Sequence, residues 1–314
     1  MNIILFGGAG FIGTNLSRKL AENKENNIII VDKSKVGFLN LEKMNLKNVV
    51  FKERKFDMET DFEEILENQD IVYHLISTTV PTTSNQDIAQ EMMSNVVVTA
   101  KLLDACVASK VKKVIFLSSG GTVYGKSVEC PLKEDAQTNP ITSYGVQKLT
   151  IEKLLYLYNH MYGLDYRVVR LSNPYGPFQR PNGVQGVITT FVYKALKEED
   201  IVVFGDGSVV RDFIYIDDAV NGIIKIAENQ GSHKVYNLGC GKGTSINHLL
   251  EVLQNVIDRK MNIIYKPGRN VDVGVNYLDI EQYEKDFGKL SLVSLEKGIL
   301  NTMDFLKNNY IKDN

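Results

Sequence analysis

The sequence contains little cysteine and proline, and it has no tryptophan. Its three cysteines, Cys106, Cys130 and Cys240, form no disulfide or metal-binding pattern. We therefore expect a protein that folds without disulfides in a reducing compartment, the cytoplasm. No metal site is expected either, because the histidines share no ligand spacing. His74 ends an apolar run and is expected to be a buried structural residue.

The sequence also lacks an apolar run long enough to span a bilayer, and no signal peptide precedes the first expected strand at residue 2. Lys and Arg total 36 against 38 Asp and Glu, so the net charge of −2 gives no attraction for nucleic acid or an anionic membrane. With 44% hydrophobic and 24% charged residues, the 314-residue chain has the composition of a globular protein of one or two lobes.

The clearest local pattern lies at the start of the chain. Residues 2–6 form a short apolar run typical of a buried strand, and residues 11–20 have the pattern of a helix. Between them, Gly7, Gly10 and Gly13 are spaced G-x-x-G-x-x-G. Strand, glycine turn and helix together present backbone N–H groups and a positive helix end to a pyrophosphate. We expect the glycines to permit the tight turn, the approach of phosphate and the packing of helix on strand, respectively.

An acidic residue follows the second expected strand, because the run 27–31 ends at Asp32. A carboxylate at this place accepts hydrogen bonds from the adenosine ribose and repels a 2′-phosphate, which favours NAD over NADP. Lys33 and Lys35 weaken that preference, since both would attract the same phosphate.

Strands and helices alternate through the first half of the chain. We expect strands at 70–75, 113–118 and 166–171, and helices at 91–110 and 143–162. Such alternation predicts an α/β fold, a doubly wound parallel Rossmann sheet that binds ligands at the carboxyl ends of its strands.

The character of the sequence changes after residue 171. Loop-rich segments at 173–177 and 180–186 precede shorter elements. We therefore expect an NAD-binding Rossmann domain at 1–171 and a smaller α/β substrate lobe at 172–314, with residues 212–240 partly returning to the first domain.

A tyrosine and a lysine carry the main chemical pattern. Tyr144 and Lys148 are four residues apart and lie on one face of a helix. A nearby ammonium favours the phenolate, so we expect the pKa of Tyr144 to fall below about 10 and its phenol to act as an acid or base. Ser119 and Thr122 follow the preceding strand, where their hydroxyls could bind a substrate oxygen.

Taken together and in order, these motifs resemble the extended short-chain dehydrogenase/reductase family over nearly the whole chain, and within it the UDP-hexose 4-epimerases. The matching residues are Gly7-x-x-Gly10-x-x-Gly13, Asp32, Asp57, His74 with Leu75, Asn95, the segment 118–125 (S-S-x-x-x-V-Y-G), Tyr144 with Lys148, the segment 173–177 (N-P-Y-G-P) and the segment 211–214 (R-D-F-I).

The resemblance implies a cofactor site and a substrate site. NAD is the implied cofactor, held by Gly7, Gly10, Phe11, Ile12, Gly13, Asp32, Lys33, Asp57, Met58, Leu75, Ser77, Asn95, Tyr144 and Lys148. A UDP-sugar is the implied substrate, held by Ser119, Thr122, Tyr144, Asn173, Gln185, Arg211, Arg269, Asp272 and Asn276.

Some of these implied roles are specific. Arg211 and Arg269 are expected to bind the diphosphate, although Arg211 could instead pair with its neighbour Asp212. Asp272 is expected on the uridine ribose. Asn276 is expected beside the sugar 2-substituent, where a small side chain would admit an N-acetyl group.

One position departs from the family pattern. The family usually carries its catalytic Ser or Thr where this chain has Gly120. Ser119 or Thr122 would then supply the hydroxyl. Ser119 is slightly favoured, and the sequence does not decide between the two.

The implied activity is NAD-dependent, reversible C4 epimerisation of a UDP-hexose through a 4-keto sugar, by an isomerase that forms a homodimer through the helices at 91–110 and 143–162. Other nucleotide-sugar reactions stay open. Thr78, Thr79 and Arg180 could bind a carboxylate, as a glucuronate 4-epimerase or decarboxylase requires.

Three further alternatives are weaker or unresolved. A 4,6-dehydratase needs an acid pair where this chain has only glycines, at 120 and 121. A non-catalytic NAD sensor would not need both Tyr144 and Lys148. A 4-ketoreductase is not distinguished by the motifs.

Overall fold

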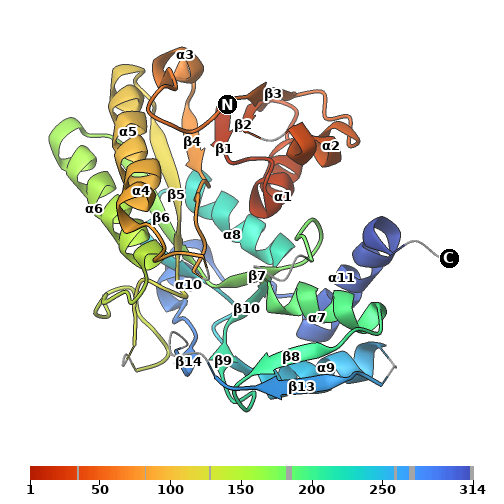
Figure 1. Ribbon diagram of the computed structural model, residues 1–314. Helices are drawn as coiled ribbons and strands as arrows, with labels where there is room; N and C mark the ends of the chain where they lie inside the picture. Colours follow the sequence, from red (N-terminus) through yellow and green to blue (C-terminus); the bar gives the residue numbers. More distant parts are fainter. Residues whose placement is uncertain are drawn as a thin grey trace.

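The computed structural model describes residues 1–33, 35–81, 83–126, 129–181, 186–257, 260–268 and 273–311. At its centre is a seven-stranded parallel sheet in the order β11-β6-β5-β4-β1-β2-β3, which confirms the predicted α/β fold (Figure 1). Its strands are β1 (Asn2–Phe6), β2 (Asn27–Asp32), β3 (Val49–Glu53), β4 (Ile71–His74), β5 (Lys113–Ser119), β6 (Asp165–Leu171) and β11 (Val235–Leu238).

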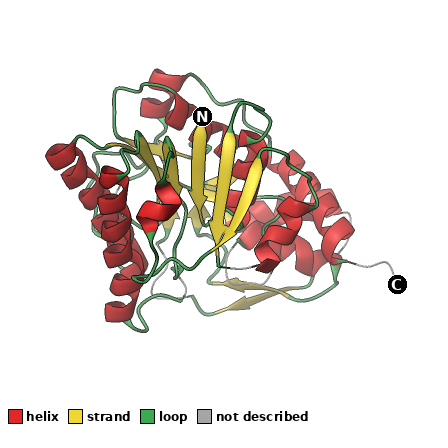
Figure 2. Ribbon diagram, turned by 90° about the horizontal axis from the view of Figure 1, so that it is seen from above, coloured by secondary structure: helices red, strands yellow, loops and turns green. Residues whose placement is uncertain are grey.

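Helices cover both faces of this sheet (Figure 2). Along β1, Ile3 and Leu5 pack into one hydrophobic cluster while Ile4 and Phe6 pack into the other, as the alternation of side chains on a strand requires. The first cluster includes residues of α1 (Phe11–Leu20), α2 (Lys35–Glu42) and α8 (Ile216–Glu228), and the second includes residues of α3 (Phe62–Leu66), α5 (Val98–Ala108) and α6 (Ser143–Tyr162).

Two helical segments on the second face of the sheet carry residues of the predicted cofactor site. The helix expected at 91–110 is a continuous run of α4 (Ile88–Met92), the π-helical turn η1 (Met93–Val97) and α5. The helix expected at 143–162 is confirmed, and it ends at Gly163, whose φ of +71° is the left-handed conformation that glycine adopts most easily.

A smaller group of elements lies beyond the carboxyl ends of the parallel strands (Figure 1). Three two-residue strands of this group pair with one another: β9 (Val210–Arg211) is antiparallel to β12 (Thr244–Ser245) and parallel to β14 (Val275–Asn276). The remaining elements are β7 (Asn173–Tyr175), α7 (Val187–Leu196), β8 (Ile201–Phe204), β10 (Phe213–Tyr215), α9 (Ile246–Ile257), β13 (Ile263–Lys266), α10 (Glu281–Phe287) and α11 (Leu295–Tyr310).

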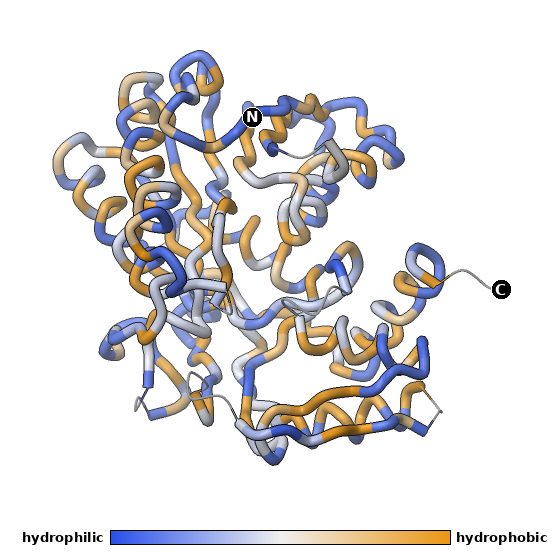
Figure 3. The backbone as a smooth tube through the Cα atoms, viewed as in Figure 1, coloured by the Kyte–Doolittle hydropathy of each residue, from blue (hydrophilic) through white to orange (hydrophobic). Residues whose placement is uncertain are grey.

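The chain does not divide simply at residue 171. β11 pairs with β6 at the edge of the main sheet, and α8 packs against α1. Hydrophobic stretches follow the strands of both parts of the protein, and hydrophobic and hydrophilic segments alternate along the helices (Figure 3). No helix among the described residues is long and apolar enough to cross a membrane. The proposed boundary at residue 171 stays a prediction.

Candidate functional site

Of the three evenly spaced glycines at the turn from β1 into α1, two have no room for a side chain. Gly7 has a φ of +82°, and a Cβ there would lie 2.9 Å from the Ile76 side chain. A Cβ on Gly13 would lie 2.5 Å from Gly8 Cα. Gly10 differs, because its added Cβ would meet only a backbone oxygen, at 3.3 Å. This open side allows a bulky phosphate to approach the backbone.

The start of α1 has the chemistry of an anion site. The helix begins at Phe11, after Gly10, and its first turn carries no acidic side chain. The amides of Phe11 and Ile12 are therefore among the first-turn donors that a helix leaves for another acceptor, at its positive end. Asp32 lies beside this turn, since its Oδ2 accepts a hydrogen bond from Ala9 N at 3.3 Å.

Asp57 organises the chain after β3. Its Oδ1 accepts hydrogen bonds from Glu59 N at 3.1 Å and from Thr60 Oγ1 at 3.0 Å. The carbonyl of Met58 accepts a hydrogen bond from Lys101 Nζ at 2.6 Å. These contacts fix the loop, and the role of Asp57 and Met58 toward adenine stays a prediction.

Asn95 holds the loop that follows β4. Its Oδ1 accepts a hydrogen bond from Thr78 N at 2.8 Å, and its Nδ2 donates to Thr78 Oγ1 at 2.7 Å. The loop is bonded internally as well, because Ser77 Oγ donates to Thr79 O at 2.8 Å. Asn95 lies within the π-helical turn η1, a rare conformation that recurs at functional sites.

Tyr144 and Lys148 lie in the first two turns of α6, which Thr142 caps by accepting a hydrogen bond from Gly145 N at 3.1 Å. Lys148 Nζ is 5.6 Å from the centroid of the Tyr144 ring and donates to Leu117 O of β5 at 2.8 Å. The pair expected from the sequence is therefore assembled at the carboxyl end of β5.

The charge state of this pair differs from the expectation. Burial raises the pKa of Tyr144 to about 12, although the nearby Ser119 hydroxyl acts in the opposite direction. Burial also lowers the pKa of Lys148 to about 7. The sequence predicts a lowered pKa for the Tyr144 phenol. That prediction is wrong for the protein without ligands, because burial shifts the pKa of both groups more than their neighbours do.

The structure separates the two candidate hydroxyls. The Ser119 hydroxyl lies close enough to the Tyr144 phenol to lower its pKa, whereas Thr122 Oγ1 is buried with no hydrogen-bond partner among the described residues. A Cβ on Gly120 would lie 2.6 Å from Leu278 Cδ1 and 3.1 Å from Arg170 O. The space beside residue 120 is thus filled by Leu278, which explains why this chain carries glycine there.

Two expected substrate residues are brought together from distant parts of the chain. Arg211 of β9 is the register partner of Asn276 of β14. Asn276 is buried, and its Nδ2 reaches Gly120 O at 3.4 Å. The Arg211 guanidinium donates to Val273 O at 2.6 Å. The contact with Gly120 connects the smaller lobe to the turn that follows Ser119 at the end of β5.

The alternative role of Arg211 as a surface partner of Asp212 receives no support from the surroundings of Asp212. That carboxylate is fully buried and accepts backbone hydrogen bonds from Cys240, Gly241 and Leu278.

Asn173 makes its contact elsewhere in the smaller lobe. Asn173 Nδ2 donates to Asp212 O at 2.9 Å, so its side chain joins β7 to the residue between β9 and β10. Gln185, Arg269 and Asp272 lie outside the described residues.

His74 is a buried structural residue, as predicted. Its Nε2 lies 2.8 Å from Thr99 Oγ1, and its ring contacts Phe56 and Phe116. Burial lowers the pKa of His74 to about 3, so the imidazole is neutral near pH 7. No three His, Cys, Asp or Glu side chains in the described ranges are grouped in a way that could hold a metal ion.

A buried ion pair close to the site was not anticipated from the sequence. Glu152 of α6 binds Arg170 of β6, and Glu152 also accepts a hydrogen bond from Ser118. A signal was present, because Glu152 continues the four-residue spacing of Tyr144 and Lys148 along one face of α6.

Comparisons with known proteins agree with this geometry. The sequence profile of the NAD dependent epimerase/dehydratase family matches residues 3–239. A UDP-glucose 4-epimerase of Mycolicibacterium smegmatis is 30% identical over 311 residues, covering 98% of this chain and 99% of the relative.

Two solved structures are similar over nearly the full length. The UDP-glucose 4-epimerase of Thermotoga maritima with UDP-glucose has a TM-score of 0.91 and 35% identity, covering 98% of this chain and 99% of that one. The UDP-glucuronic acid 4-epimerase of Bacillus cereus, in complex with UDP-glucuronic acid and NAD, has a TM-score of 0.90 and 27% identity, covering 99% and 100%.

Proposed function

Since the chain belongs to the NAD-dependent epimerase/dehydratase family, we propose that this enzyme interconverts the C4 epimers of a UDP-hexose, UDP-glucose and UDP-galactose. The observation that carries the proposal is the grouping of Ser119, Tyr144 and Lys148 at the carboxyl end of β5. The full-length similarity to UDP-glucose 4-epimerases supports the choice of substrate.

The residues around the glycine turn fit NAD. Gly10 leaves its backbone open to the pyrophosphate, and Asp32 has the position and charge to bind the adenosine ribose. Asp57, Met58, Leu75 and Ser77 would border the rest of the cofactor. When bound, NAD supplies the reversible oxidation at C4 of the sugar.

The protein side chains handle the proton at the C4 oxygen. Tyr144 takes the proton from the hydroxyl and returns it after the sugar has turned, and Ser119 holds the same oxygen by a hydrogen bond. Lys148, when protonated, favours the phenolate of Tyr144, and its position suits contact with the nicotinamide ribose.

The substrate would be held by its diphosphate, remote from the reacting carbon. Arg211 and Arg269 are proposed to bind the phosphates, and Asp272 the uridine ribose. Asn173 and Gln185 are proposed as further contacts to the nucleotide. A tether at the diphosphate leaves the 4-keto sugar free to present its other face, so that the binding energy serves positioning.

Incubation with UDP-glucose and with UDP-galactose tests this function directly. The expected result is approach to the same equilibrium mixture from both sides, with no net formation of NADH. Steady accumulation of NADH would identify a dehydrogenase instead, and an unchanged UDP-hexose would exclude the proposed substrate.

A second candidate is the same inversion on UDP-glucuronate. It is favoured by the similarity to the glucuronic acid 4-epimerase and by the exposed Arg180, a possible partner for the substrate carboxylate. Thr78 is less available, since its hydroxyl already binds Asn95 and Ser94. Turnover of UDP-glucuronate with none of UDP-glucose would favour this candidate.

We also propose that the enzyme is a homodimer that pairs the outer surfaces of the α4–η1–α5 run and α6. Large apolar side chains are exposed on this surface, as on a surface that binds a partner. A molar mass of 35.3 kDa by light scattering, the mass of a single chain, would contradict the pairing. These side chains are Ile88, Met93, Val97, Tyr156, Leu157, Met161 and Tyr162.

A further inference from the structure

A buried polar network lies one helical turn beyond Lys148 on α6. Glu152, which is 5% exposed, accepts a hydrogen bond from Ser118 Oγ on its Oε1 at 2.5 Å. Its Oε2 accepts from Arg170 Nη2 at 2.7 Å, and Arg170 Nε lies 3.2 Å from both carboxylate oxygens. Both oxygens of the carboxylate are therefore bonded, one by a hydroxyl and both by the guanidinium.

Arg170 is fixed from its other side as well. Its Nη1 donates to Glu134 O at 2.9 Å and to the Tyr124 hydroxyl at 3.1 Å, and the guanidinium lies 5.0 Å from the Tyr124 ring centroid. The network therefore joins α6, β5 and β6 immediately behind Ser119, the neighbour of Ser118 in the chain.

The charged and titratable groups that face Lys148 come from two elements. Tyr144 and Glu152 lie on its own helix and His74 on β4, whereas Arg170 of β6 binds Glu152. Two contacts come from β5: Lys148 Nζ donates a hydrogen bond to the Leu117 carbonyl, and it lies 4.7 Å from the centroid of the Phe116 ring. His74 is neutral and Tyr144 protonated near pH 7, so Glu152 provides the negative charge in this set.

We propose that Glu152 is a positioning residue, which keeps Lys148 in its charged form and, through Ser118, holds Ser119 beside Tyr144. This inference rests on the proposed function. Burial lowers the pKa of Lys148 to about 7, and the Glu152 carboxylate acts in the opposite direction. Removal of the carboxylate should therefore make the amine lose its proton at a lower pH, and activity that requires the ammonium should decline at a lower pH.

Two variants test the charge effect. Glu152→Gln removes the charge but leaves Arg170 buried without its carboxylate, which could prevent folding. The double variant Glu152→Leu/Arg170→Met removes both charges together and avoids that penalty. In the folded variants, the alkaline decline of kcat should move down by about one pH unit, because the carboxylate that opposes the effect of burial on Lys148 is gone.

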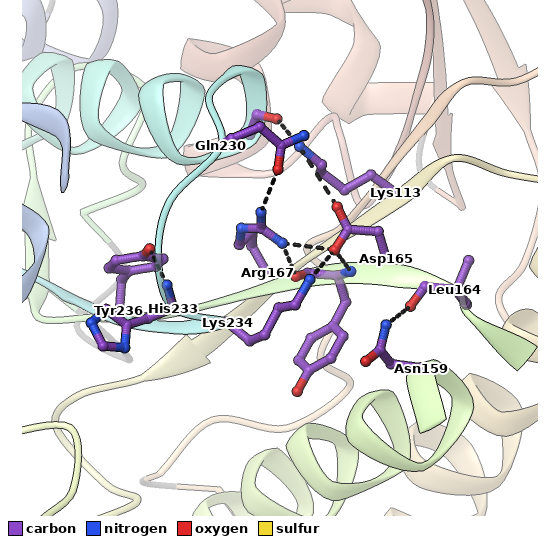
Figure 4. Close-up of polar contacts among 11 residues, drawn as sticks. Lys113, Asn159, Leu164, Asp165, Arg167, Gln230, His233, Lys234 and Tyr236 are labelled. Atoms are coloured by element: carbon purple, nitrogen blue, oxygen red, sulfur yellow. Dashed lines mark hydrogen bonds and ion pairs between the residues drawn. The ribbon is translucent and has the colours of Figure 1, made fainter. Parts of the chain in front are cut away.

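Arg167→Met is the matched control. Arg167 is a buried arginine on the same strand, and it pairs with Asp165 at 2.7 Å at the other end of β6 (Figure 4). Asp165 keeps Lys234 as a partner in this variant. The alkaline decline should stay where it is in the unaltered enzyme, and an equal shift in the control would overturn the inference.

Ser118→Ala tests the second part of the proposal. It keeps both charges, so the alkaline decline should not move, while kcat should fall at least fivefold with KM unchanged. A kcat equal to that of the unaltered enzyme would show that Ser118 does not position Ser119.

A direct titration of Lys148 separates this inference from the proposed function. NMR of protein labelled with ¹³C at lysine Cε, with the signal assigned by Lys148→Arg, reports the protonation of the amine without any substrate. A shifted titration in the Glu152 variants supports the inference even if no UDP-hexose is turned over. An unshifted titration overturns it even if the enzyme is an active epimerase.

Discussion

The hydroxyl of Ser119, at the end of β5, lies close enough to Tyr144, at the start of α6, to lower the pKa of its phenol. This proximity places a hydroxyl beside the phenol proposed to exchange a proton with the sugar. Both groups can therefore contact one substrate oxygen, while Lys148 lies 5.6 Å from the centroid of the phenol ring. The proposed chemistry depends on this arrangement. The hydroxyl of Ser119, the phenol of Tyr144 and the amine of Lys148 can each be removed by a single substitution.

Tyr144→Phe should lower the epimerisation rate by about 10²–10⁴-fold, the usual contribution of a general acid or base. NAD should remain bound, since the change removes one hydroxyl and little volume. Tyr158→Phe is the control, because its hydroxyl on the same helix donates to Asp104 instead. Turnover of Tyr144→Phe within about tenfold of the unaltered enzyme would exclude the role.

Ser119→Ala should reduce kcat by about a hundredfold, through loss of a hydrogen bond to the C4 oxygen. Thr122→Val should keep full activity, because it replaces a buried hydroxyl that has no partner in the described part of the chain. The same variant should be at least as stable as the unaltered protein in urea unfolding. The opposite pattern of activities would assign the catalytic hydroxyl to Thr122.

Gly120→Ser, which restores the usual residue of the family, should not raise activity. The new Cβ would lie 2.6 Å from Leu278 Cδ1 in a fully buried region, so we expect a loss of about 1–3 kcal/mol in the free energy of unfolding.

Gly121→Ser is the control for this substitution, since an added Cβ there meets only Ser119 Oγ, at 3.8 Å. Equal stability of the two variants in urea would contradict the packing argument.

The sequence was sufficient for the glycine turn because the constraint there is local. Gly13 is required by atoms only a few residues away, so its spacing from Gly7 carries the structural information. The same holds for Tyr144 and Lys148, which one helix places on a common face.

The rest of the site depends on packing between distant segments. Ser119 and Thr122 are distinguished by their surroundings, and the position between them, Gly120, is filled by Leu278 from the smaller lobe. The pairing of Arg211 with Asn276 joins two strands of two residues each, too short to have a pattern of their own.

Stability in acid should depend on His74. Its folded pKa of about 3 lies below its ordinary value of 6.5, so the unfolded chain binds a proton that the folded protein does not. The free energy of unfolding should therefore fall as the pH drops from 6.5 toward 3, by up to about 1.4 kcal/mol per pH unit from this group.

His74→Gln retains a donor near Thr99 and does not titrate in this range. Urea unfolding at pH 7 and pH 5 should show a smaller acid loss in this variant than in the unaltered protein. Equal losses would show that the imidazole is not responsible.

The size of the sugar 2-substituent that the enzyme accepts should depend on Asn276. This buried residue lies beside Arg211 in register and reaches the carbonyl of Gly120, so its side chain borders both the proposed diphosphate site and the catalytic loop. We expect the small asparagine to admit UDP-N-acetylglucosamine as well as UDP-glucose. Asn276→Tyr should lower kcat/KM for the N-acetylated sugar at least tenfold more than for UDP-glucose, since only the former must find room for the acetamido group. An equal loss for both substrates would mean that Asn276 supports the loop through Gly120 and does not select the sugar.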